Sequence, residues 1–82
     1  MKKYIIEFQQ YGTPQQVPTN CNTIQFVNAG TSTVIIDRVL TLVAGQSFNV
    51  EGNINEVTNK SINIAFGNSG TRNLIVIKKT YV

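Results

Sequence analysis

Short runs of alternating apolar and polar residues cover much of the chain. Near the N-terminus, Tyr4, Ile6 and Phe8 recur at every second position among more polar neighbours. A period of two is typical of a β-strand with one apolar face. We therefore predict a strand over residues 2–10 in which these three side chains share a face.

The stretch from residue 24 to residue 52 organises the rest of the chain. Its apolar runs predict four strands, over residues 23–27, 33–36, 39–43 and 46–51. Turn residues separate them at Asn28–Gly30, Asp37–Arg38 and Ala44–Gly45. The Asp37–Arg38 pair predicts a hairpin, and one continuous bent strand is the alternative.

Two further strands are predicted toward the C-terminus, over residues 61–66 and 73–79, with a hairpin connection at Gly67–Gly70. The run Leu74–Ile77 is apolar on both faces, which predicts a central or doubly covered strand. Residues 15–22 are predicted to form a polar loop, because Pro14 and Pro18 do not fit a central strand.

About seven short strands and no helix predict an all-β domain, a small antiparallel β-sandwich or barrel. One domain is expected over residues 1–82, with residues 54–59 as a loop. Residues 1–11 are expected to form an edge strand that pairs or exchanges with a neighbouring subunit, through Tyr4, Ile6 and Phe8.

Size and composition favour a subunit that is covered by neighbours. A chain of 82 residues buries a thin core, and its single cysteine, Cys21, allows no internal disulfide. Charged residues are 13% of the chain, against about 25% in an average domain, and interface cores are similarly depleted in charge. We therefore expect a homo-oligomer, and a soluble monomer with an amide-rich surface is the alternative.

The chain has few residues of the types that catalyse reactions or bind metals. The chain has no histidine, so nucleophilic catalysis lacks its usual base and zinc its usual ligand. Cys21 is interpreted as an ordinary loop thiol. The four acids occupy turns or outward strand positions, where a solvated carboxylate is the default; they are Glu7, Asp37, Glu51 and Glu56. We predict no enzyme activity, no cofactor and no metal.

A net charge of +3 leaves a second hypothesis open, a small β-barrel that binds single-stranded nucleic acid. Lys78, Lys79 and Tyr81 are its candidate contacts, because single-strand binders combine basic and stacking side chains. All four phenylalanines are predicted to point inward, which leaves Tyr11 and Tyr81 as the aromatic residues on which a base could stack. Lys2 and Lys3 precede an apolar run too short for a signal peptide or a membrane span, so synthesis in the cytoplasm is expected.

Four segments carry a resemblance: FVNAG, VIIDRVLTLVAGQSF, INIAF and LIVIKKTYV. Over about residues 24–82 they resemble short all-β virion proteins of bacteriophages, particularly those that infect Bacteroidota. The resemblance implies a structural role as a capsid decoration, spike-base, connector or tail subunit, with other virion proteins as partners and the virion as final location. It supplies no site residues. A similar rhythm occurs in cupredoxin-like sandwiches, whose copper ligands include the histidine that this chain lacks.

Overall fold

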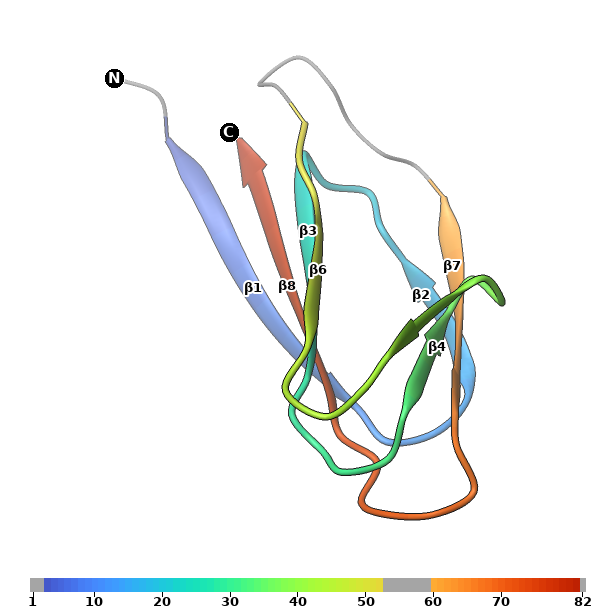
Figure 1. Ribbon diagram of the computed structural model, residues 1–82. Coiled ribbons are helices and arrows are strands. Elements are labelled where there is room, and N and C mark those ends of the chain that lie inside the picture. The colour runs from blue at the N-terminus through green and yellow to red at the C-terminus, as the bar shows by residue number, and fades with distance from the viewer. Residues whose placement is uncertain (1–2, 53–59, 82) are drawn as a thin grey trace.

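Two antiparallel sheets of four strands each pack face to face (Figure 1). This computed structural model describes residues 3–52 and 60–81, and no helix occurs among them. The predicted all-β class is confirmed, as a sandwich with eight strands where about seven were expected. The strands are β1 (Tyr4–Tyr11), β2 (Gln15–Pro18), β3 (Thr23–Asn28), β4 (Val34–Ile36), β5 (Leu40–Leu42), β6 (Ser47–Val50), β7 (Ser61–Phe66) and β8 (Leu74–Tyr81).

The strand order is that of a jelly roll. One sheet has the order β1-β8-β3-β6 and the other β2-β7-β4-β5. The pairings are therefore nested, with β1 on β8, β2 on β7, β3 on β6 and β4 on β5. Eight strands folded over in this way make two packed sheets, as jelly rolls do. We call them the β1 sheet and the β2 sheet.

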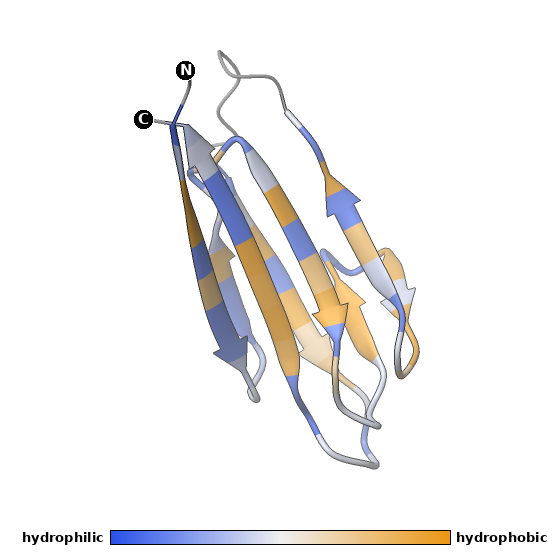
Figure 2. Cartoon of the chain, turned by 90° about the vertical axis from the view of Figure 1, so that its left-hand side faces the viewer, coloured by the Kyte–Doolittle hydropathy of each residue, from blue (hydrophilic) through white to orange (hydrophobic). Residues whose placement is uncertain are grey.

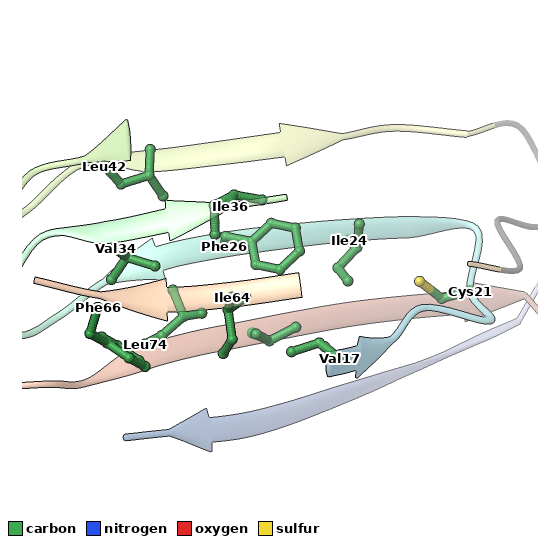
Figure 3. Packing of buried hydrophobic residues seen from close by; sticks show 11 residues of the cluster. Val17, Cys21, Ile24, Phe26, Val34, Ile36, Leu42, Ile64, Phe66 and Leu74 are labelled. Carbon is green, nitrogen blue, oxygen red and sulfur yellow. The ribbon is translucent and has the colours of Figure 1, made fainter. Parts of the chain in front are cut away.

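The core lies between the sheets and is built mainly from alternate residues of β3, β4, β7 and β8 (Figure 3). Residues paired across an antiparallel ladder point to the same side, so the register carries one apolar set across each sheet. In β8, Leu74 and Val76 are fully buried, and the strand lies between β1 and β3. The buried apolar residues are Val17, Cys21, Ile24, Phe26, Val34, Ile36, Leu42, Ile64, Phe66, Leu74 and Val76.

The prediction of a polar loop over residues 15–22 is wrong. Gln15–Pro18 forms β2, which pairs with β7 along one edge of its sheet and fully buries Val17. Proline is compatible with an edge strand, where one side of the backbone has no ladder partner. Cys21 is buried at one end of the core, not exposed in a loop (Figure 3). The loop predicted over residues 54–59 lies outside the described residues.

The hairpin at Asp37–Arg38 is confirmed, and the bent-strand alternative is excluded. β4 and β5 pair antiparallel, and the Val39 N–H donates to the Ile36 carbonyl oxygen at 3.1 Å. Asp37 and Arg38 have φ of 51° and 65°, the positive values that tight hairpin turns require at both central positions. Val39 belongs to this turn and is 86% exposed, although it was predicted to begin a strand.

A buried amide joins the two sheets near the β3–β4 connection. Asn28, at the end of β3, is fully buried, and its Nδ2 donates to the carbonyl oxygens of Ser32 at 2.8 Å and of Leu42 at 2.9 Å. Its Oδ1 accepts from the Gly30 N–H at 3.1 Å. Leu42 belongs to β5 in the β2 sheet, so this side chain couples a turn to both layers.

Candidate assembly surface

Strand β1 forms one free edge of its sheet and carries the predicted assembly residues. Its register with β8 places Tyr4 opposite Tyr81, Ile6 opposite Lys79 and Phe8 opposite Ile77. All of these lie on the outer face, because Val76 and Lys78, which alternate with them along β8, point inward and are buried. The structure thus brings Tyr4, Ile6 and Phe8 together, and they face solvent.

The three β1 side chains are unusually exposed for apolar residues. The exposed fractions are 51% for Tyr4, 47% for Ile6 and 69% for Phe8. On the same face, Ile75 and Ile77 of β8 are half-buried and extend the apolar area toward the middle of the sheet. We call these five residues the β1–β8 face. Figure 2 looks onto it, and the apolar first half of β8 appears there in orange.

Aromatic and basic side chains meet at one end of this face. The Lys79 ammonium lies 4.5 Å from the centroid of the Tyr4 ring and 5.2 Å from that of Tyr81. The two rings make an edge-to-face contact with centroids 6.2 Å apart. Cation–π and edge-to-face contacts each contribute roughly 0.5–1 kcal/mol at exposed sites. The cluster therefore orders the first residues of β1 against the end of β8.

The candidate nucleic-acid contacts do not form one surface. Lys78 points inward and is 7% exposed, whereas Lys79 and Tyr81 lie on the outer face. The Lys79 charge is also engaged by the two rings. The hypothesis needs basic and aromatic side chains side by side on one surface, and β8, a central strand, separates Lys78 from the other two.

The outer face of the β2 sheet has a different character. Alternate residues of β7 that point away from the core are Ser61, Asn63 and Ala65, and the register places Thr41 of β5 and the partly buried Ile35 of β4 on the same side. Most of these side chains are small or polar, as is usual for a solvent-facing sheet surface. The contrast marks the β1–β8 face as the apolar outer surface of the sandwich.

Cys21 has the surroundings of an inert thiol. Burial raises the pKa of the Cys21 thiol, the nearby Lys78 charge lowers it and Glu7 raises it, with burial the largest effect. A raised pKa lowers the thiolate fraction, and the thiolate is the reactive form. The sequence interpretation of an unreactive cysteine agrees with this direction, although its position in the core was not foreseen.

The described part of the chain holds no cluster of side chains suited to bind a metal ion. No three residues of the types His, Cys, Asp and Glu gather within residues 3–52 and 60–81. Asp37 lies on the surface, where its carboxylate pairs with the Lys60 ammonium at 3.2 Å. The described residues include no helix that could cross a membrane.

The prediction that all four phenylalanines point inward is wrong for Phe8, and Phe48 points inward but is only partly covered. Phe26 and Phe66 are buried, but Phe8 faces out and Phe48 is 39% exposed. Phe48 does point to the inner side, opposite Phe26, but it sits on the edge strand β6. The facing edge strand β5 has only three residues, so it covers Phe48 poorly.

The comparisons with known proteins identify no family for this chain. No protein-family model matches the chain, and no curated protein matches it. Among solved structures, the chain is similar to a de novo designed double-stranded β-helix determined by solution NMR. The two share 17% identity over 94% of this chain and 97% of the designed one, with a TM-score of 0.45. A likeness at this level carries no argument about function.

Proposed function

We propose that the protein is a non-enzymatic structural subunit, of a bacteriophage particle, that assembles through β1 and the β1–β8 face. The observation that carries the proposal is the exposure of Tyr4, Ile6 and Phe8 together on an edge strand. Edge strands present unpaired backbone groups, and native proteins usually protect them with charge, proline or a cover. Only Glu7 supplies such charge within β1.

The apolar area that these β1 side chains expose is large for a single folded chain. With about 200 Å² for each free side chain, Tyr4, Ile6 and Phe8 leave roughly 300–350 Å² of the β1–β8 face in water. A contiguous apolar patch of about 300–600 Å² is the largest that a typical monomer shows, and it is often functional. At ~25 cal/mol per Å², covering it supplies about 8 kcal/mol before the costs of association.

The particle itself is proposed from the resemblance to phage virion proteins. Jelly rolls build viral capsid proteins as well as lectins and cupins, so the fold is compatible with a virion role without selecting it. Within a particle, we propose a decoration, spike-base, connector or tail position, where a small rigid sandwich is joined by its edge. Mass spectrometry of purified particles from producing cells should recover the protein at a fixed ratio to the major capsid protein.

Light scattering on the full chain tests the assembly step. We expect a discrete multimer that persists at 1 M salt, because apolar contacts are not screened. Phe8→Ser should weaken it at least tenfold, while Val39→Ser, which removes an apolar side chain that is 86% exposed in a turn, should leave it unchanged. A monomer at all accessible concentrations would overturn the proposal. Salt-sensitive binding of an oligonucleotide would instead support the nucleic-acid hypothesis.

A further inference from the structure

The sequence of β1 suits pairing with the same strand of another copy, along the edge that is free in the single chain. We propose that its partner is a second copy of this chain, joined by antiparallel pairing of the two β1 strands about Ile5. This rests on the function proposed above and names the partner and the geometry of the joint. The two β1 sheets would then form one continuous sheet of eight strands.

Symmetry restricts how two copies can pair. A two-fold axis perpendicular to the sheet keeps the outer face of both copies on the same side. Because successive side chains alternate between faces, residues directly opposite each other must then both be even-numbered or both odd-numbered. The joint is therefore centred on one residue that faces its own copy. In the middle of β1 the choices are Ile5, Ile6 and Glu7.

Charge selects among the three centres. A joint centred on Glu7 puts two carboxylates directly opposite each other, which is destabilising. A joint centred on Ile6 leaves Lys3 and Glu7 opposite uncharged residues. A joint centred on Ile5 pairs Lys3 of each copy with Glu7 of the other and brings the two Ile5 side chains together. Lys3, Ile5 and Glu7 are all exposed in the single chain, so they are available for this pairing.

The joint also brings apolar side chains together. Ile5 is 52% exposed even though it lies on the inner side of β1, and the pairing covers it against its copy. On the outer face the same register places Tyr4 of each copy opposite Ile6 of the other, and such cross-strand pairs stabilise a sheet. Strand pairing adds main-chain hydrogen bonds along the edge that β1 leaves unpaired in the single chain.

Disulfide trapping tests the register in the full chain. Directly opposed residues in an antiparallel pair have Cα atoms about 4.5–5.5 Å apart, within the range that a disulfide bridges. With oxidised glutathione as the oxidant, Ile5→Cys should form a covalent dimer at least tenfold faster than Ile6→Cys. Val39→Cys, in the exposed turn, is the control for random collision. The wild-type chain controls for Cys21, which is buried.

A charge exchange gives a second, independent measurement. Lys3→Glu places two acidic side chains opposite each other at each end of the joint and should weaken dimerisation roughly 2- to 30-fold. Glu7→Lys should weaken it to a similar extent, because it places two lysines opposite each other at each end. Mixing the two variants restores both pairs, so a heterodimer should form with the wild-type affinity. Circular dichroism of each variant alone confirms that the domain is folded.

The outcomes separate this inference from the proposed function. Faster trapping of Ile6→Cys than of Ile5→Cys, or trapping of Ile5→Cys at the Val39→Cys rate, overturns pairing about Ile5. If Phe8→Ser still dissociates the multimer in that case, assembly through the β1–β8 face stands and the partner strand is another one. If Phe8→Ser has no effect on the multimer, the proposed function fails.

Discussion

The buried amide of Asn28 permits a sharp test of how the two sheets are held together. Asn28→Asp changes the Nδ2 amide group to an oxygen with almost no change in shape. In the native protein that nitrogen donates to the Ser32 and Leu42 carbonyl oxygens at 2.8 and 2.9 Å. After the substitution a carboxylate oxygen faces those same two acceptors. Repulsion therefore takes the place of two hydrogen bonds at a site with no exposure to solvent.

The expected loss of stability follows from these contacts. A hydrogen bond contributes about 0.5–1.5 kcal/mol to stability, so the loss of both costs about 1–3 kcal/mol. Burial of an unpaired carboxylate adds to this. At about 0.05–0.15 kcal/mol per residue, a domain of 82 residues has about 4–12 kcal/mol in total. Asn28→Asp should therefore lose at least half of the free energy of unfolding at pH 7.

The loss should depend on pH with a defined sign. Burial without a partner raises the pKa of an aspartate in the folded state above its unfolded value of about 3.9. Between the two values the folded state holds more protons, so the free energy of unfolding falls as pH rises. Relative to the wild type, Asn28→Asp should recover stability when the pH is lowered from 7 to 4.

Urea titrations followed by circular dichroism, at one protein concentration, measure both effects. Asn49→Asp is the matched control, because it introduces the same charge at an exposed position of β6 and should change stability by less than about 0.5 kcal/mol. A loss below about 1 kcal/mol for Asn28→Asp at pH 7, or a loss that grows on acidification, would show that these hydrogen bonds do not couple the sheets as described.

Three further substitutions and one labelling experiment test local features. Gly30→Ala should destabilise the fold by about 1–3 kcal/mol in urea titrations, because a Cβ there would collide with the Thr71 carbonyl oxygen and lie 2.8 Å from the Asn73 nitrogen. Arg38→Gly should raise the thermal midpoint, with a gain of up to about 1 kcal/mol, because the φ of 65° suits glycine. Cys21 should react with iodoacetamide at least 100-fold more slowly in the folded chain than in urea. Its raised pKa also implies that stability declines as pH rises above the ordinary thiol value of 9.0, and Cys21→Ala should reduce that decline.

The strands with the clearest period were the most predictable from the sequence. In β7, Ile64 and Phe66 alternate with less buried neighbours as predicted, and the apolar run that begins β8 does lie in the middle of a sheet. Periodicity works there because both strands have neighbours on each side and a partner sheet on one face. The same pattern also indicated the hairpin at Asp37–Arg38, although the strands on either side are only three residues long.

β2 was missed because its pattern is carried by one residue. In Gln15–Pro18 only Val17 reaches the core, and two prolines close by suggest a loop. An edge strand of four residues gains its stability from the ladder to β7, a contact that no local pattern reveals. Tertiary pairing thus overrides the local signal, as is usual for short strands.

The assembly surface shows the limit of periodicity most clearly. Alternation correctly placed Tyr4, Ile6 and Phe8 on one face of a strand, but it does not say whether that face meets a core or water. The register with β8 decides this, because Leu74 and Val76 take the inner side and leave Phe8 beside the half-buried Ile77 on the outer side. An apolar stripe on the outer face of an edge strand costs solubility and contributes nothing to the core of its own domain. In the proposed pairing about Ile5, Tyr4 of each copy lies beside Ile6 of the other, and the trapping of Ile5→Cys tests that arrangement directly.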